Sequence, residues 1–113
     1  MYQPSFTTIT LSSTPNSQQS LYTLLSGIQS QIRKVASFVL IQADVNGGST
    51  AYAVGQSNVA PQTGSAKSGT GTQLFASQTL TLGPFESNLL HLDEIYVSAS
   101  AASAIMNVVV VTR

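Results

Sequence analysis

Three residues, His91, Asp93 and Ser87, come closest to a catalytic set in type and spacing. A serine nucleophile needs a histidine to accept its proton and an acid to orient that histidine. On a predicted strand His91 and Asp93 would share one face, with Ser87 close in the sequence. Such a triad is recognised by geometry, and nothing in the sequence places an oxyanion hole or a pocket beside it. We therefore predict that the chain is not an enzyme.

Metal binding is the next chemistry to weigh. The chain has one histidine and no cysteine, which leaves too few ligands for a usual zinc site. Asp93 and Glu94, as adjacent residues of a strand, would point to opposite faces and would not converge on a cation. Calcium held partly by backbone oxygens stays an open alternative that no motif favours. We predict no metal and no cofactor.

The segment Gly64–Gly71 superficially resembles a phosphate-binding loop. It lacks the Gly-Lys-Ser/Thr order of such loops, and no helical pattern follows it. We interpret Lys67 as a solvated loop charge.

The aromatic residues could form either a sugar-stacking surface or part of the core. Tryptophan is absent and no loop clusters polar with aromatic residues, which favours the core. The residues concerned are Tyr2, Tyr22, Tyr52, Tyr96, Phe6, Phe38, Phe75 and Phe85.

Composition limits the class of protein. A chain of 113 residues fits one domain, and only 7% of them are charged, against about 25% in typical soluble domains. The net charge is zero, and the few basic residues form no stripe that could bind nucleic acid. An uncharged surface also gives little electrostatic protection against self-association. The amino terminus does not resemble a secretory signal, and no run approaches the ~20 apolar residues of a membrane helix. We expect synthesis in the cytoplasm, with a secreted chain that has lost its signal as the open alternative.

The elements that must position any site are organised around Val35–Gly55. Val39, Ile41 and Ala43 alternate with Phe38, Leu40 and Gln42, which predicts a strand with one apolar face and a second face that begins apolar and ends polar. We expect the first half of this strand to be covered on both sides and the second half to emerge toward solvent. Asn46-Gly47-Gly48 tolerates the positive φ angles of a tight turn, and Tyr52 and Val54 alternate with small residues after it. The pattern predicts a β-hairpin.

Other segments follow the same logic. Leucines and isoleucines at intervals of three and four predict an amphipathic helix over 17–34, capped by Asn16 or Ser17. We expect the apolar stripe of this helix to close one end of a β core, with an exposed partner-binding helix as the alternative. Residues 1–5 are expected to be a loose arm and residues 56–72 a long polar loop. Further strands are predicted over 6–12, 73–82, 90–97 with a bulge, and 104–112, where consecutive valines indicate burial on both faces or a partner covering one of them. One mainly β domain is expected, an antiparallel β-sandwich or jelly-roll-like barrel with one short helix.

Four segments resemble, in composition, those of small structural proteins of tailed bacteriophage particles. They are Tyr52–Val59, Gln78–Phe85, Leu92–Val97 and Asn107–Arg113, rich in Ser, Thr and β-branched residues and poor in charge. The resemblance implies a compact β fold, frequently a homotrimer, that decorates or cements a capsid or belongs to a tail or fibre. It implies no catalytic residues, and the predicted helix matches no particular member.

From this resemblance we expect a virion structural protein, made in the host cytoplasm, that binds copies of itself and the major capsid protein or other virion proteins. A receptor- or carbohydrate-binding module of a tail or fibre is the alternative. No contact with nucleic acid or membrane is expected. The arm and the polar loop supply the predicted partner contacts: Tyr2, Gln3, Pro4, Gln62, Ser65 and Lys67.

Overall fold

The computed structural model describes residues 3–62, 69–85 and 90–112. It is mainly β, with antiparallel sheets and a single short α-helix, as the sequence predicted. The elements in chain order are β1 (Gln3–Thr10), β2 (Gln19–Ser20), α1 (Leu21–Ser26), β3 (Val35–Ala36), β4 (Phe38–Ala43), β5 (Tyr52–Gly55), β6 (Thr72–Leu74), β7 (Thr79–Leu82), β8 (Leu90–His91), the 3-10 helix η1 (Leu92–Glu94), β9 (Tyr96–Ala99) and β10 (Ile105–Thr112).

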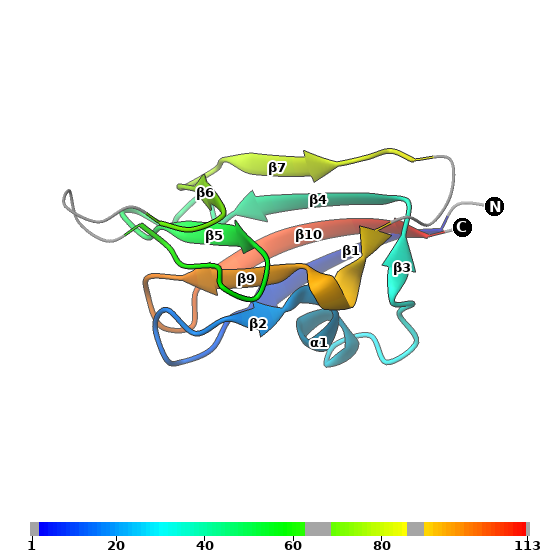
Figure 1. Cartoon of the computed structure of the whole chain (residues 1–113), viewed down its shortest axis with the longest axis horizontal. Coiled ribbons are helices and arrows are strands. Elements are labelled where there is room, and N and C mark those ends of the chain that lie inside the picture. Colours follow the sequence, from blue (N-terminus) through cyan, green and yellow to red (C-terminus); the bar gives the residue numbers. More distant parts are fainter. Residues whose placement is uncertain (1–2, 63–68, 86–89, 113) are drawn as a thin grey trace.

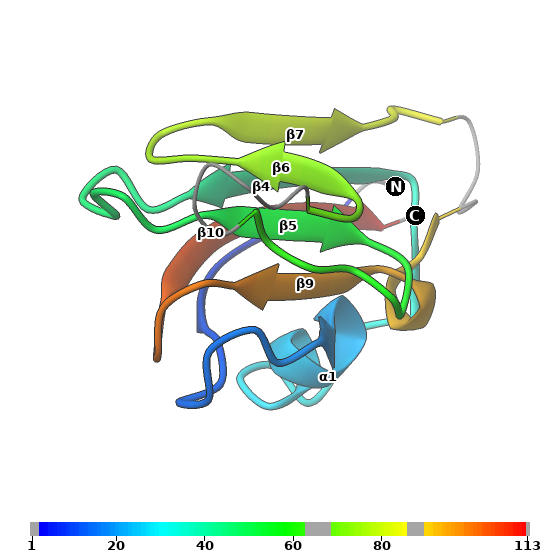
Figure 2. The ribbon, with the colours of Figure 1, turned by 60° about the vertical axis from the view of Figure 1, so that its left-hand side comes forward.

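Two four-stranded sheets make up most of the molecule (Figure 1). Sheet A has the strand order β1-β10-β4-β7, and sheet B has the order β2-β9-β5-β6. In Figures 1 and 2, strands β5 and β9 of sheet B lie in front of β4 and β10 of sheet A. The short strands β3 and β8 pair separately. Among the strands of the two large sheets, only β5 and β6 follow each other within one sheet, so the chain repeatedly crosses between the layers.

The core consists of the inward-facing side chains of both sheets. Tyr52 is the largest of the fully buried side chains. Strict alternation in β4 and β10 sends every second residue inward, because successive side chains of a strand point to opposite faces. The central contributors are Ile9, Val39, Ile41, Met106, Val108 and Val110 from sheet A and Tyr52, Val54, Leu74, Val97 and Ala99 from sheet B.

The predicted hairpin between β4 and β5 is wrong. β4 pairs with β10 and β7, whereas β5 pairs with β9 and β6. Of the three predicted turn residues, Gly48 has a positive φ, at +58°, and Asn46 and Gly47 do not. The connection instead joins sheet A to sheet B, and the apolar inner faces of both strands contribute to the same core.

The helix is much shorter than the predicted 17–34. It begins after Ser20, whose hydroxyl accepts a hydrogen bond from Thr23 N at 3.1 Å, so neither Asn16 nor Ser17 is the cap. Residues Gln19–Ser20 instead form an edge strand of sheet B. The helix ends at Ser26, and of the apolar stripe Leu21 and Leu25 are buried, while Ile28 is exposed. The apolar stripe therefore packs on the core as a helix over only about one and a half turns.

Three further boundaries differ from the predictions. The arm 1–5 is in part structured, since Gln3–Ser5 belong to β1. The segment 73–82 is divided between sheets, as a turn with Ser77 at a φ of +69° separates β6 from β7. The predicted bulge at Asp93-Glu94 is the 3-10 helix η1. A short turn or one helical turn can redirect a chain without interrupting an alternation pattern visibly.

The polar loop 56–72 is partly packed against sheet B. Ala53 and Ser98 point away from the core yet are 0% exposed, and the described residues that follow β5 pass over this side (Figure 2). Val59 is buried in this loop, and its backbone oxygen accepts a hydrogen bond from Gln18 Nε2 at 2.9 Å. The bridge between Ala60 and Thr70 closes the described part of the loop.

Candidate interaction surface

The residues that could have formed a triad are not assembled. His91 lies in β8 opposite Val35, and its side chain is exposed. Asp93 lines an open hollow to which His91 does not contribute. Ser87 lies outside the described residues.

The acidic hollow differs from the expectation for Asp93 and Glu94. Both residues belong to η1, not to a strand, so they line the same hollow instead of pointing to opposite faces. Gln56, Ser57 and Tyr96 complete this hollow of about 380 Å³. Within the described ranges no three His, Cys, Asp or Glu side chains gather as metal ligands would.

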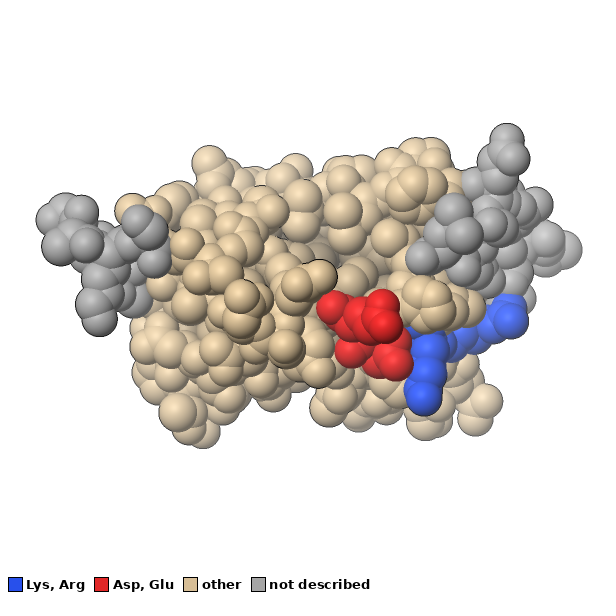
Figure 3. Space-filling model, viewed as in Figure 1, with Lys and Arg blue, Asp and Glu red and all other residues tan. Residues whose placement is uncertain are grey.

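The charged residues visible on this side are concentrated around the hollow. Figure 3 shows the acidic side chains as one patch with basic side chains next to it, and the remaining described surface in that view is uncharged. Lys34 belongs to the segment between α1 and β3, and its Nζ lies 5.6 Å from the centre of the Tyr22 ring. The backbone oxygen of Lys34 accepts a hydrogen bond from Leu92 N at 2.7 Å, which fixes this segment against η1.

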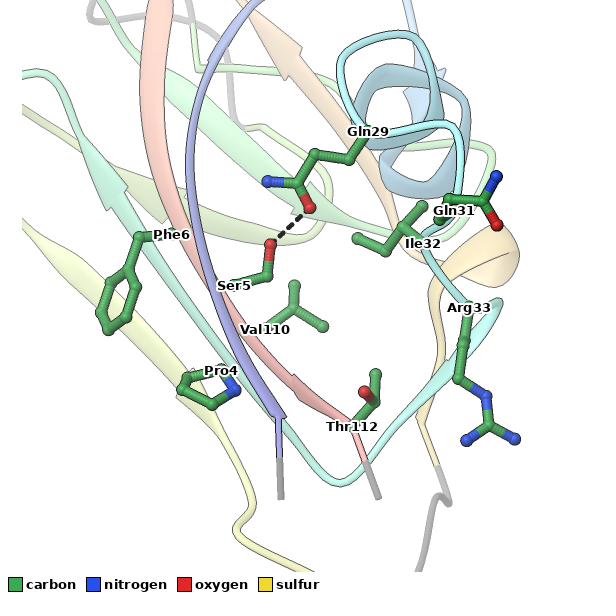
Figure 4. A pocket seen from close by; sticks show the side chains of 9 residues that line it. All are labelled: Pro4, Ser5, Phe6, Gln29, Gln31, Ile32, Arg33, Val110 and Thr112. Atoms are coloured by element: carbon green, nitrogen blue, oxygen red, sulfur yellow. Dashed lines mark hydrogen bonds between the residues drawn. The ribbon is translucent and has the colours of Figure 1, made fainter. Parts of the chain in front are cut away.

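A second hollow, of about 440 Å³, lies beside strand β1 at the segment after α1 (Figure 4). Gln29 spans it at one end, since Ser5 Oγ donates to Gln29 Oε1 at 2.5 Å and Gln29 Nε2 donates to Thr7 Oγ1 at 2.8 Å. These bonds attach the segment after α1 to the edge strand of sheet A. An edge strand covered in this way is less available for pairing with another chain.

The outer side of sheet A carries two apolar rows, which we call the apolar face. Residues directly opposite in an antiparallel pair share a face, so the strand register defines the rows. They consist of Pro4, Val111 and Phe38 in one row and Phe6, Val109 and Leu40 in the next. Phe6 is 73% exposed, and Figure 4 shows its ring on the opposite side of β1 from Gln29. The strands β1, β4, β7 and β10 contain no charged residue.

A polar row borders the apolar face. Thr8 Oγ1 donates to Asn107 Oδ1 at 2.9 Å, and Asn107 Nδ2 donates to Gln42 Oε1 at 3.4 Å, so the row is hydrogen-bonded across three strands. A hollow of about 230 Å³ lies where this row meets Phe6, Leu40 and Val109. The exposed ring and the hollow are therefore neighbours on one surface.

The structure places the predicted partner residues apart. Pro4 is exposed at one end of the apolar face, and Gln3 is paired with Thr112 in the backbone of β1. Gln62 is exposed in the loop, where its N donates to Gln73 Oε1 at 2.8 Å. Tyr2, Ser65 and Lys67 lie outside the described residues.

The sequence reasoning missed most of the apolar face and assigned its aromatic residues to the core. Phe6, Phe75 and Phe85 are exposed, and Tyr52 is the aromatic residue buried in the core among those described. The signal was present in β4 and β10, where Leu40 and Val109 are apolar although they occupy the outward positions.

No family model, curated protein or solved structure matches this chain. In the described part of the chain, no helix has the length and apolar character that spanning a membrane requires.

Proposed function

We propose that this protein is a structural subunit of a virus particle, most specifically a decoration or cement protein that stabilises a capsid through protein–protein contacts. The observation that carries the proposal is the apolar face, an uncharged surface with a phenylalanine 73% exposed on its edge strand β1. Exposed apolar patches of this kind commonly mark interaction sites in soluble proteins. The absence of an assembled catalytic set among the described residues fits a role based on contact.

The strand order supports this assignment. We infer that sheets A and B form a jelly-roll sandwich, because the orders β1-β10-β4-β7 and β2-β9-β5-β6 alternate between layers as two Greek keys do. Jelly rolls are used in viral capsid and lectin domains. The Ser/Thr-rich, charge-poor composition of the strands, which resembles that of phage structural proteins, favours a capsid protein over a lectin.

The proposed mechanism is physical. Copies of the chain bury their apolar faces, and the polar loop with Gln62 and the amino-terminal end of β1 bridge neighbouring shell subunits through backbone and hydroxyl hydrogen bonds. Apolar contacts suit a particle that meets changing salt, because salt screens exposed ion pairs far more than it weakens apolar burial.

The test is to look for the chain in purified virus particles and to measure its copies per particle by quantitative mass spectrometry. A copy number that fits the symmetry of the capsid lattice is expected for a decoration protein. A few copies per particle would indicate a tail or fibre position. Absence from particles would contradict the proposed function.

A carbohydrate-binding module is the second candidate, and the hollow lined by Asp93, Glu94, Gln56 and Tyr96 favours it. Carboxylates and amides accept hydrogen bonds from sugar hydroxyls, and an aromatic ring provides a face for stacking. Saturable binding to a member of a glycan panel, abolished by Tyr96→Ala, would support this candidate. No binding across a broad panel would remove it.

A further inference from the structure

The apolar face has a shape that a second copy of the same face can match. We infer that two copies of this chain pair through their apolar faces around a two-fold axis, each inserting Phe6 into the hollow beside Leu40 and Val109 of the other. The inference deepens the proposed function and rests on it, since it names the first partner of the same surface.

The ring and the hollow provide the first argument. A two-fold interface uses the same patch on both partners, so each copy must present both a projection and a matching recess. Phe6 projects with 73% of its surface exposed, and the adjacent hollow measures about 230 Å³. The hollow is open to solvent, and its lining includes Phe6 itself and the polar row as well as Leu40 and Val109, so a ring from a second copy would lie against its apolar side.

Charge provides the second argument. Pairing identical surfaces places every charge near a copy of itself, which is unfavourable unless the surface has none. The four strands of sheet A contain no charged residue. Of the described acidic residues, Asp93 and Glu94 belong to η1, and Asp44 lies in the turn directly after β4, beyond the polar row. A second copy therefore meets no like charge within the two apolar rows themselves.

The polar row provides the third argument. A polar group that is covered without a partner costs free energy, which normally opposes burial of such a border. Here Thr8, Asn107 and Gln42 already bond to one another across three strands. A second copy can cover part of this row without breaking these bonds.

The size of the face sets the expected strength. Strands ~4.8 Å apart with ~3.4 Å per residue give sheet A a flat area of roughly 400 Å², of which the two apolar rows cover about half. Stable interfaces bury about 800 Å² per partner, so the isolated pair is expected to be weak and concentration-dependent. In a particle, many linked copies would reinforce such a contact.

The experiment is sedimentation of the full chain over a wide concentration range, compared with Phe6→Ser and with Phe75→Ser as the matched control. Phe75 is also exposed but follows β6 of sheet B. We expect a monomer–dimer equilibrium, weakened at least about tenfold by Phe6→Ser and unchanged by Phe75→Ser, because buried aromatic residues dominate interface energetics. Thermal unfolding of each variant checks that it folds.

A second measurement locates the contact. In spectra of the methyl groups, the signals of Leu40 and Val109 should shift with protein concentration, while those of the exposed Ile28 and Val45 should stay constant. This readout does not depend on any variant.

The outcomes separate the two proposals. A monomer at every concentration, a trimer, or a dimer that responds equally to both variants would overturn the two-fold pairing, whether or not the chain occurs in particles. Binding of Leu40 and Val109 to a capsid protein instead of a second copy would also overturn it. A dimer as described, with no chain in particles, would overturn the proposed function alone.

Discussion

Ser98 Oγ is a buried side-chain oxygen that no hydrogen bond reaches among the described residues. Its residue is 0% exposed under the chain between β5 and β6. Ser37 is nearly as buried, but its Oγ donates to Val111 O at 3.1 Å. The two serines therefore provide a matched comparison of an unpaired and a paired hydroxyl.

We predict that Ser98→Ala leaves the free energy of unfolding unchanged or raises it by up to about 1 kcal/mol, since it removes an unpaired buried group. Ser37→Ala should lower it by about 1 kcal/mol through the lost hydrogen bond. Urea denaturation of both variants measures the difference. Equal losses in the two variants would mean that Ser98 has a partner, such as a bound water.

Tyr52 links the core to the turn after β4. Burial of its side chain, followed by the negative charge of Asp44, raises the pKa of the Tyr52 hydroxyl above its usual value of 10.0, while backbone hydrogen bonds with Ile105 and Asp44 act in the opposite direction. The folded state therefore holds this proton more tightly than the unfolded chain does.

We predict that the stability contributed by this proton is fully present below about pH 10 and decreases as the pH rises from there through the pKa of the folded state. The unfolded chain ionises first, which favours unfolding. Denaturation at pH 8 and at about pH 11 measures the decrease, and the Tyr52→Phe variant corrects for all other groups. A decrease of the same size in Tyr52→Phe would contradict the assignment.

The elements show what alternation alone can determine. In β4 the sequence predicted the inner face correctly, because Val39 and Ile41 are buried. It also predicted that Phe38 and Leu40 are covered, and these outward residues are only partly buried. It could not predict the partners of β4, since an apolar inner face fits a hairpin neighbour and an opposing sheet equally well. The apolar face could not be predicted for the same reason, because a strand with exposed apolar residues on its outer side has the same sequence pattern as a strand that is buried on both sides.

The prediction of a helix over 17–34 was wrong for a related reason. Apolar residues from Leu21 to Ile32 keep a helical spacing, but of these only Leu21 and Leu25 are fully buried, while Leu24 and Ile32 pack against the core from partly exposed positions. After Gly27 the chain turns so that Gln29 can bond to Ser5 and Thr7 of β1. Tertiary hydrogen bonds of this kind override a weak local propensity and leave no mark in the spacing.

The cap of α1 gives the prediction at this scale. Ser20→Ala should lower the free energy of unfolding by about 1 kcal/mol, because Thr23 N loses its acceptor at the first turn. Ser17→Ala, at the cap predicted from the sequence, should change it by less than about 0.5 kcal/mol. Urea denaturation compares them, and a larger loss in Ser17→Ala would place the start of the helix earlier in the chain.

At the scale of the whole molecule, the distribution of charge separates two surfaces. The described charged residues near η1 and the segment before β3 gather on one side, whereas sheet A presents strands without charge. Contacts made by the two surfaces should therefore respond differently to salt. A surface with ion pairs weakens as salt screens them, and an apolar surface does not.

This difference yields the last prediction. Raising sodium chloride from about 0.05 M to about 0.5 M should leave the self-association of the chain unchanged or slightly stronger, because no ion pair is lost at the apolar face. Leu40→Lys should abolish association at low salt by placing like charges opposite each other, and high salt should restore part of it. Sedimentation at both salt concentrations measures these effects. Association of the unmodified chain that weakens steadily with salt would show that the charged side of the molecule, and not sheet A, holds the copies together.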